Sequence, residues 1–345
     1  MTETTSLAAE ETSPQGKIVD SFGRVHTNLR ISVTDRCNIR CFYCMPLENV
    51  DFRPRNELLT FDEIHRFVQV AADLGVNKVR LTGGEPLVRR DLWRLVEKLS
   101  SVDGIQEIAM TTNAILLADH AQQLRDAGLK RLNISLDALD NETFRRIARR
   151  DGLEKVLHGI EVAQGVGFDS IKINTVAISD VNEDQVIPLA RFCRDHDLHL
   201  RFIEFMPLDA EANWQDSAVL SGESLRSIIS QAVIELAPIE QADPNQPAVD
   251  FAYTDGQGKV GFINSVSQPF CGSCNRLRIT SEGQIQNCLF SSGKWDARAL
   301  LRDSDCCNEQ IAQLILDCVR AKSAGHGSDN LDFVRPDKAM YQIGG

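Results

Sequence analysis

Two groups of three cysteines are the residues of this sequence that point most directly to chemistry. Their spacings are C-x3-C-x2-C for the first triple (Cys37, Cys41 and Cys44) and C-x2-C-x13-C for the second triple (Cys271, Cys274 and Cys288). Three is the informative number, because a structural zinc site and a saturated [4Fe-4S] cluster each take four protein ligands. A triple leaves one metal position open for a small molecule. The alternative for either triple is a zinc ion completed by a distant His or Asp, or a cluster completed by another cysteine.

Polar motifs stand where the predicted strands end, and the first triple follows the end of the first of these strands. The carboxyl ends of parallel strands form one edge of an α/β sheet, where active sites lie. The motifs after the second, third, fourth and sixth strands are Thr82-Gly83-Gly84-Glu85-Pro86, Thr111-Thr112-Asn113, Ser135-Leu136-Asp137 and Glu204-Phe205-Met206. A lone Gly-Gly pair is typical of a tight turn, but glycine also lets a backbone approach a ligand closely. Together with the cysteines it predicts a binding site.

An alternation of strand and helix patterns must position these motifs. The predicted strands are Leu29–Thr34, Lys78–Leu81, Glu107–Thr111, Arg131–Leu136, Ser170–Ala177 and His199–Phe205. The first predicted helix begins with a capping box at Thr60 and Glu63 and ends at Gly75. The other helices are predicted at 91–100, 117–127, 140–149, 153–164 and 183–196. Such βα units predict a parallel sheet with right-handed crossovers, either doubly wound or part of a βα barrel, and six are too few to close an eight-stranded barrel.

The alternation stops after the sixth predicted strand. Residues 235–250 are rich in Pro, Gln and Asp, which predicts a loop or linker. The segments that follow predict a small antiparallel sheet and then a helix near 308–322; the strands are Phe251–Tyr253, Lys259–Asn264, Arg276–Thr280 and Gln284–Asn287. The polar residues 1–16 predict a disordered tail.

Length and composition limit the class of protein. A chain of 345 residues predicts about two domains, and 43% hydrophobic with 25% charged residues is typical of a soluble globular protein. No apolar stretch reaches the roughly 18 residues of a membrane span, and the N-terminus has no pattern of a signal peptide, so we expect a cytoplasmic protein with reduced cysteines. The net charge is −12, but residues 206–260 alone hold nine acidic and two basic residues. A basic pocket elsewhere is therefore compatible with the charge.

The motifs C-N-I-R-C-F-Y-C and L-T-G-G-E-P-L resemble those of the radical S-adenosylmethionine (SAM) enzymes. In that superfamily three cysteines hold a [4Fe-4S] cluster whose free iron is chelated by SAM. A narrower resemblance, from about Phe22 to Gly345, is to the GTP 3′,8-cyclase (molybdenum cofactor biosynthesis protein A) family. It rests on LRISVTDRCNIRCFYCMP, VRLTGGEPLVRRDL, TTNA, LNISLDALD, KINTV, RFIEFMPL, CGSCNRLRIT and the terminal IGG. The 13-residue gap of the second triple is the discriminating mark.

The resemblance implies a fold and an activity. The fold would be a partial (βα)6 TIM-like barrel at 17–235, whose open side is closed by a small α+β domain at 236–345 that carries an auxiliary cluster. The activity would be that of a lyase converting GTP to (8S)-3′,8-cyclo-7,8-dihydroguanosine 5′-triphosphate, the first step of molybdenum cofactor biosynthesis. A 5′-deoxyadenosyl radical would abstract the ribose 3′ hydrogen. The implied cofactors are two [4Fe-4S] clusters and SAM.

The resemblance also implies residue roles. The first triple would ligate the cluster that binds SAM, and the second triple the cluster that contacts the purine of GTP. SAM would be contacted by Tyr43, Gly84, Ser135 and Met206. GTP would be bound by Arg30, Arg80, Thr111, Lys172, Arg276, Arg278 and the backbone of Leu277. Direct assistance to catalysis is implied for Arg276, Arg278, Gly344 and Gly345. A triphosphate needs such cations, and charges inside buried strands need an anionic partner.

Partners and alternatives complete the expectations. The chemistry implies a low-potential donor such as flavodoxin or ferredoxin and transfer to the next enzyme of the pterin pathway, and the family suggests a homodimer. We expect no nucleic-acid or membrane partner. A radical SAM maturase acting on a peptide would carry additional C-terminal cysteines in another spacing. A zinc-stabilised nucleic-acid-binding protein would show closed four-ligand sites and a contiguous basic surface. Neither set of features is found in the sequence.

Overall fold

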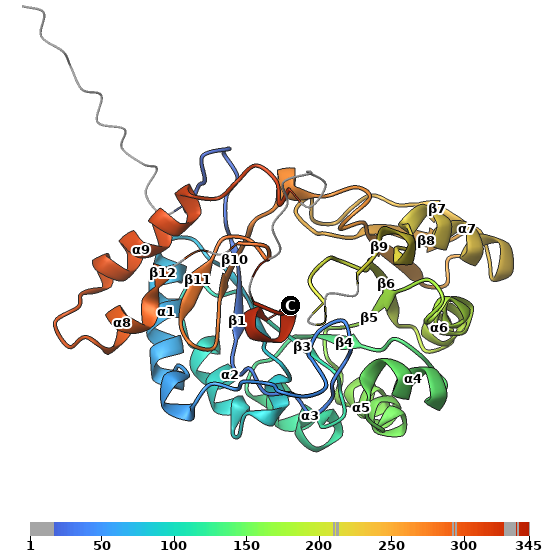
Figure 1. Cartoon of the computed structure of the whole chain (residues 1–345), viewed down its shortest axis with the longest axis horizontal. Coiled ribbons are helices and arrows are strands. Elements are labelled where there is room, and N and C mark those ends of the chain that lie inside the picture. Colours follow the sequence, from blue (N-terminus) through green and yellow to red (C-terminus); the bar gives the residue numbers. More distant parts are fainter. Residues whose placement is uncertain are drawn as a thin grey trace, which may run out of the picture.

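The computed structural model describes residues 17–209, 211, 214–291, 293, 295–327, 336 and 338–344. The predicted tail at 1–16 lies outside these residues. In the described part of the chain, twelve strands form one sheet in the order β12-β11-β10-β1-β2-β3-β4-β5-β6-β9-β8-β7. The sheet curves into an open arch with helices on its outer side (Figure 1). This mostly parallel α/β sheet confirms the predicted partial barrel.

The strands and helices of the predicted βα units are all present. The strands, β1 to β6, run Asn28–Ser32, Lys78–Thr82, Glu107–Thr112, Arg131–Ser135, Ser170–Ala177 and His199–Glu204, and each pairs in parallel with the next. The helices, α1 to α6, run Phe61–Asp73, Leu92–Ser100, Leu117–Asp126, Asn141–Ala148, Leu153–Val166 and Val186–Asp195. Two of the helices, α4 and α5, follow the same strand, β4. The predicted capping box of α1 is present, with the Glu63 amide donating to Thr60 Oγ1 at 3.1 Å and the Thr60 amide donating to Glu63 Oε2 at 2.6 Å.

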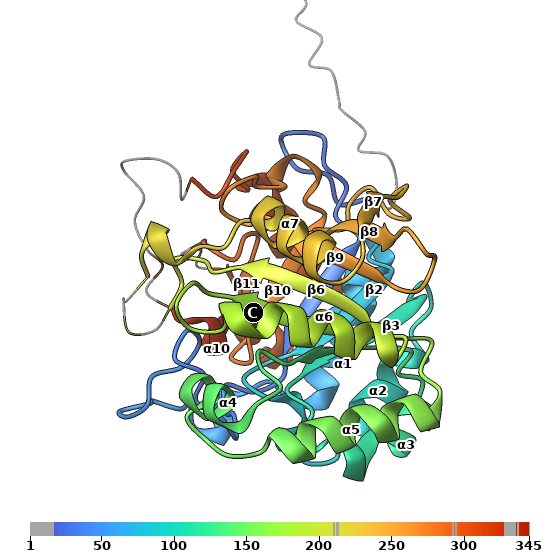
Figure 2. The same cartoon turned by 90° about the vertical axis from the view of Figure 1, so that its right-hand side faces the viewer.

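Strand alternation separates an apolar outer face of the sheet from a polar inner face. In β1, Leu29 and Ile31 are fully buried in the core, whereas Arg30 between them faces the inside of the arch. The outer face of the sheet is covered by α1 to α6, as the two views in Figures 1 and 2 show. Because successive side chains of a strand point to opposite faces, a strand that buries its aliphatic residues under helices must turn the residues between them inward.

The expected small antiparallel sheet is wrong, because its strands lie at the two opposite edges of the arch. On one edge, β9 (Lys259–Ile263) pairs in parallel with β6 and antiparallel with β8 (Val249–Tyr253). On the other edge, β10 (Arg276–Ile279) pairs in parallel with β1 and antiparallel with β11 (Gln284–Gln286). Both hairpins therefore extend the barrel sheet, so each edge strand of the six-unit barrel gains a backbone partner.

The remaining elements surround these edges. They are α7 (Gly222–Ala232) and β7 (Leu236–Pro238) beside β8, β12 (Trp295–Asp296) beside β11, and the helices α8 (Ala297–Arg302), α9 (Asn308–Arg320) and α10 (Met340–Ile343). The predicted helix near 308–322 is thus confirmed as α9, while α7 and α8 had no sequence prediction. The short α10 lies inside the arch (Figure 1). Within the described residues, no helix combines the length and the apolar character needed to cross a bilayer.

Candidate active site

One cavity of 1430 Å³ occupies the inner face of the arch, and both cysteine triples line it. Most of the other site residues proposed from the sequence line the same cavity: Arg30, Tyr43, Arg80, Gly84, Thr111, Ser135, Lys172, Met206, Arg276 and Arg278. Leu277 differs, since its side chain is fully buried in the core on the opposite face of β10. Gly344 lies at the strand ends described below, and Gly345 falls outside the described residues.

The Gly-Gly pair brings the loop after β2 against the loop that leads to the first triple. The Gly84 amide donates to the Thr34 carbonyl at 2.7 Å, and the Glu85 amide donates to the Arg36 carbonyl at 2.8 Å. A Cβ atom would lie 2.5 Å from the Thr34 oxygen at Gly83 and 2.4 Å from the Arg36 oxygen at Gly84. Glycine is therefore required for loop-to-loop contact, a reason in addition to the predicted approach to a ligand.

Glu85, the next residue of this motif, links the ends of β2 and β3. Its carboxylate accepts hydrogen bonds from Thr112 Oγ1 at 2.7 Å and from the Asn113 amide at 2.7 Å. Burial raises the pKa of Glu85 to about 7, even though these bonds oppose the rise. The Asn113 side chain in turn donates to Cys37 Sγ at 3.7 Å. The motif after the third strand thus helps to fix the first triple, a role not predicted from the sequence.

Tyr43, which precedes the last cysteine of the first triple, is held by a buried carboxylate. Its hydroxyl donates to Asp137 Oδ2 at 2.6 Å, and the other oxygen of Asp137 accepts from the Val176 amide at 2.9 Å. Burial raises the pKa of Asp137 to about 6. These bonds connect the cysteine loop to the ends of β4 and β5.

The thiols of the two triples have different electrostatic surroundings. Burial raises the pKa of Cys37 to about 11 and that of Cys44 to about 12. In the second triple, Cys274 Sγ accepts from Arg276 Nε at 3.4 Å and from Lys322 Nζ at 3.3 Å. Burial again opposes the charged form, but the positive charges of Arg276 and Lys322 prevail and lower the pKa of Cys274 to about 6. Cys274 is therefore prepared as a thiolate ligand near neutral pH.

The donor set of both triples fits iron–sulfur clusters. All six thiols are free and at least partly accessible, and they line the cavity. Among the described residues, no three His, Cys, Asp or Glu side chains are arranged to hold one metal ion. A closed zinc site gathers four donors around one ion at about 2.0–2.3 Å, whereas the thiolates of a cluster each bind a different iron.

A row of arginines crosses the inner face beside the second triple. Arg30 on β1 lies in register between Arg278 on β10 and Arg80 on β2. Burial, with the charges of its arginine neighbours, holds the pKa of Arg30 well below its usual range. The Nε atoms of Arg30 and Arg80 are buried without a hydrogen-bond partner in the described structure. Adjacent buried cations with unused donors indicate a site for a polyanion.

Further cations of the cavity were missed by the sequence reasoning. Lys78 precedes the row on β2, Arg131 begins β4, and Arg201 lies on β6, all lining the cavity. Lys78 and Arg201 could have been found, since each alternates with core residues along its strand. Lys322 could not, because it follows α9 and only the tertiary fold brings it to Cys274.

Two acidic residues, Asp243 before β8 and Asp250 within it, supply counter-ions to some of these cations. Asp243 Oδ2 accepts from Lys78 Nζ at 3.1 Å, and Asp250 Oδ2 accepts from Arg201 Nη2 at 3.3 Å. Although burial opposes its charged form, bonds from His199 and the charge of Arg201 lower the pKa of Asp250 to about 2. Part of the acidic excess at 206–260 therefore faces the cavity rather than solvent.

The C-terminal segment is inserted between strand ends. The carbonyl of Gly344 accepts from Arg278 Nη1 at 2.7 Å, and the preceding Ile343 is buried. Gly344 has a φ of +71°, and a Cβ atom there would lie 2.3 Å from Thr82 Oγ1 and 3.1 Å from Ser32 Cβ. Both the conformation and the space at this position therefore require glycine.

Comparison with known proteins defines the class. Residues 31–193 match the family model described as "Radical SAM superfamily", and residues 198–328 match the one described as "Molybdenum Cofactor Synthesis C". Among solved structures, the crystal structure of Streptococcus suis SuiB bound to S-adenosylmethionine is similar, with a TM-score of 0.59 and 17% sequence identity. The likeness covers 78% of this chain and 62% of that chain, less than two thirds of it, and it shows a shared fold. The chain is thus a radical SAM protein.

Curated relatives narrow the class to one family. A protein of Rhodopirellula baltica named GTP 3′,8-cyclase is 49% identical over 95% of this chain and 92% of its own length. Proteins with the same name from Mycobacterium sp. (strain KMS) and Streptomyces coelicolor are 43% and 41% identical, and each match covers at least 94% of the relative. The chain belongs to the GTP 3′,8-cyclase family.

Proposed function

We propose that this protein converts GTP to (8S)-3′,8-cyclo-7,8-dihydroguanosine 5′-triphosphate, a reaction begun by transfer of the ribose 3′ hydrogen to a 5′-deoxyadenosyl radical. Membership of the family and the names of its relatives support this function. The structural observation that carries it is one cavity that joins two open cysteine triples to a row of buried arginines. A nucleoside triphosphate is a ligand with enough negative charge for that row.

The first triple would hold the cluster and SAM, which together supply the organic radical after one-electron reduction. Around this position the chain offers a tyrosine fixed by Asp137, and the strand-end residues Gly84, Ser135 and Met206, as contacts for SAM. We propose a second [4Fe-4S] cluster at the second triple. The thiolate character of Cys274 supports it, because a metal must otherwise displace a proton from each thiol.

The inward-facing residues would orient GTP. Arg30, Arg80 and Lys172 would neutralise the triphosphate, with Thr111 beside them. Leu277 would take part through its backbone alone, because its side chain is buried in the core. Arg276 contacts Cys274 and Arg278 holds Gly344, so these two arginines would position the base-binding cluster and the C-terminal segment. Gly344 and Gly345 would enclose the substrate. Excluding water in this way protects a radical from side reactions.

Partners and domain roles follow from this chemistry. We propose a barrel at 17–235 that binds SAM and a segment at 236–345 that completes the GTP site. A flavodoxin or ferredoxin would supply electrons, and the next enzyme of the pterin pathway would take the product. The proposal includes a homodimer and a cytoplasmic location. The inward direction of the cations supports a small polyanion over a nucleic acid, which would need them on an outer surface.

Isotope transfer tests the reaction. The reconstituted protein, incubated anaerobically with dithionite, SAM and GTP deuterated at the ribose 3′ carbon, is expected to yield deuterated 5′-deoxyadenosine. It is also expected to yield a product that has lost the deuterium, with the mass of unlabelled GTP but a different fragmentation pattern. Mass spectrometry measures both. ATP deuterated at the same carbon serves as the control. Formation of 5′-deoxyadenosine without deuterium would contradict the proposed hydrogen abstraction, and equal turnover of ATP would contradict the specificity.

The affinity for GTP is expected to fall as the pH rises through neutrality. Burial, together with the charges of Arg201 and Arg131, lowers the pKa of Lys172 to about 7. Above this value the free protein loses the charge that a phosphate requires, so binding must take up a proton. Between pH 6.5 and 8.5 the Kd for GTP should increase by up to about 25-fold, since each pH unit above the pKa costs at most about a factor of ten.

Isothermal titration calorimetry of GTP at several pH values measures this dependence. GTP also titrates in this range, so two variants isolate the contribution of the lysine. Lys172→Arg keeps the charge at every pH and should flatten the curve while binding GTP, and Lys172→Met should bind weakly with the same flat curve. A curve as steep in both variants as in the unchanged protein would contradict the assignment.

A further inference from the structure

A short hairpin at residues 18–26 precedes the first barrel strand and lies outside both family matches. Its polar centre is the buried carboxylate of Asp20, whose Oδ2 accepts from Arg24 Nε at 2.6 Å and contacts His26 Nε2 at 3.0 Å. The other oxygen accepts from the Arg24 amide at 3.0 Å. The side chain of Asp20 thus fixes both the backbone and the guanidinium of Arg24.

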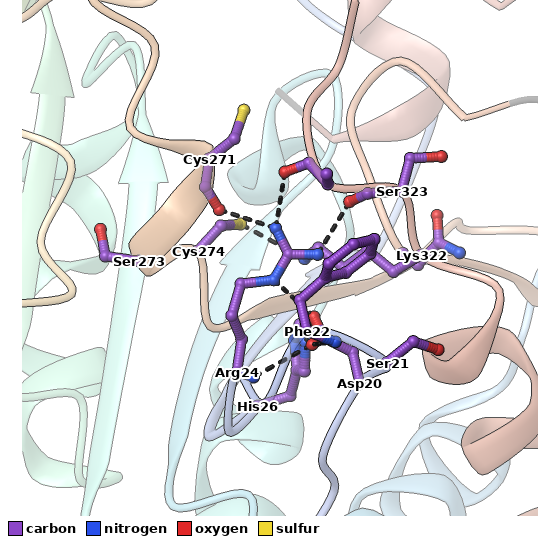
Figure 3. A network of polar contacts seen from close by, with 12 residues as sticks. Asp20, Ser21, Phe22, Arg24, His26, Cys271, Ser273, Cys274, Lys322 and Ser323 are labelled. Carbon is purple, nitrogen blue, oxygen red and sulfur yellow. Dashed lines mark hydrogen bonds and ion pairs between the residues drawn. The ribbon is translucent and has the colours of Figure 1, made fainter.

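Arg24 reaches from this hairpin to two segments near the other end of the chain (Figure 3). Its Nη1 donates to the carbonyls of Cys271 at 2.8 Å and Ala324 at 2.9 Å, and its Nη2 donates to the carbonyl of Ser323 at 2.8 Å. Arg24 is only 9% exposed, so these bonds are shielded from water. Its planar fork serves three carbonyls at once, which the point charge of a lysine cannot do in the same geometry.

The segment held by Arg24 carries Lys322 to the second triple. Lys322 Nζ donates to Cys274 Sγ at 3.3 Å and to the carbonyl of Arg276 at 3.1 Å, and the residue is 6% exposed. Figure 3 shows Cys271, Cys274, Lys322 and Ser323 grouped around the guanidinium of Arg24. Arg24 therefore contacts the backbone of Cys271 and the segment that carries Lys322, and Lys322 in turn contacts Cys274.

We propose that the hairpin at 18–26 is part of the second iron–sulfur site, with Arg24 as the residue that positions Cys271 and Lys322 as the cation that stabilises the Cys274 thiolate. This inference rests on the proposed function, which supplies the cluster at the second triple. Positive charge and hydrogen bonds at a ligating sulfur stabilise the reduced cluster and raise its reduction potential. In the described part of the chain, Arg24 makes no hydrogen bond to the first triple, so the effect should be confined to one cluster.

Iron content after anaerobic reconstitution tests the role of Arg24. The unchanged protein should bind about eight irons per chain and Arg24→Gln about four, because only the cluster at the second triple is lost. The matched control is Arg302→Gln. Arg302 also pairs with a carboxylate, Glu63 at 2.7 Å, and donates to two carbonyls of a distant segment, at 2.8 Å and 3.0 Å, but it lies away from the cavity. The Arg302→Gln variant should therefore keep all eight irons.

Two further variants separate positioning from general stability. Arg24→Lys keeps a positive charge beside Asp20 but loses the planar guanidinium that reaches the three carbonyls. It should therefore lose half of the iron, and it provides the test if Arg24→Gln does not fold. Lys322→Gln keeps the fork and therefore the iron, but the midpoint potential of the second cluster, followed by electron paramagnetic resonance, should become more negative. Full iron content in both Arg24 variants would overturn the positioning role, and an unchanged potential in Lys322→Gln would overturn the role of the lysine. An unchanged protein with only about four irons would instead overturn the proposed second cluster.

Discussion

Replacing Cys274 with serine is expected to lower the iron content of the reconstituted protein from about eight to about four atoms per chain and to abolish conversion of GTP. Cys274 is the thiol whose charged form the chain stabilises most, through Arg276 and Lys322. Serine offers no thiolate, so those cations would then surround a neutral hydroxyl. The first triple lies on the loop after β1 and keeps its own hydrogen bonds, which predicts that reductive cleavage of SAM continues in this variant.

Two variants make this result specific. Cys37→Ser should instead lose 5′-deoxyadenosine formation altogether, because it removes a proposed ligand of the cluster that activates SAM. Cys307→Ser removes an exposed cysteine at the start of α9, outside both triples, and should keep eight irons and full turnover. Iron analysis, 5′-deoxyadenosine and the GTP-derived product are measured on the same preparations. GTP conversion by Cys274→Ser would contradict the division of roles between the two triples.

Replacing Gly344 with alanine is expected to reduce cyclisation by about 10- to 100-fold. A non-glycine residue at a strained positive φ costs about 1–3 kcal/mol, and 1.36 kcal/mol corresponds to tenfold in rate. The new methyl group would also meet Thr82 Oγ1 at 2.3 Å and Ser32 at 3.1 Å, so the C-terminal segment could not stay in place. Arg278 would lose the carbonyl that it holds. Both cysteine triples lie on other loops, so the iron content should not change.

The control for this variant is a glycine with free space around it. Gly165 in α5 has no atom within 4 Å of the position of a Cβ, so Gly165→Ala should retain full activity. Steady-state formation of the cyclised product measures both variants, and the Kd for SAM checks that the other end of the cavity is intact. An active Gly344→Ala variant would show that the C-terminal segment is not needed for catalysis.

Local patterns were enough to predict the six βα units and the motifs at their ends. Leu29 and Ile31 alternate with Arg30, and Leu277 and Ile279 with Arg278, so the inner face could be read from the period of the strands. The placement of the C-terminal strands could not be predicted from local patterns. A hairpin's sequence shows that its two strands pair with each other, but β9 and β10 also pair in parallel with β6 and β1. Nothing local distinguishes an edge strand from the partner that covers it.

The same limit applies to the site. The cysteines were singled out by their spacing, and the strand arginines were named from the family resemblance, with the strand period indicating only that they face inward. Arg24 and Lys322 have no such pattern, since their importance lies in contacts with residues more than 40 positions away. Asp243 and Asp250 looked like part of a polar linker, and only the folded chain brings them to Lys78 and Arg201.

The carboxylates of Asp243 and Asp250 change how substrate capture should be understood. A free cavity lined by cations would ordinarily hold anions from solution, and a charged ligand would displace them, which makes affinity strongly dependent on salt. Here the carboxylates of Asp243 and Asp250 neutralise two of the cations of the cavity. Because Lys78 and Arg201 are already paired, the affinity of the proposed triphosphate should depend less on salt than the number of cations in the cavity suggests.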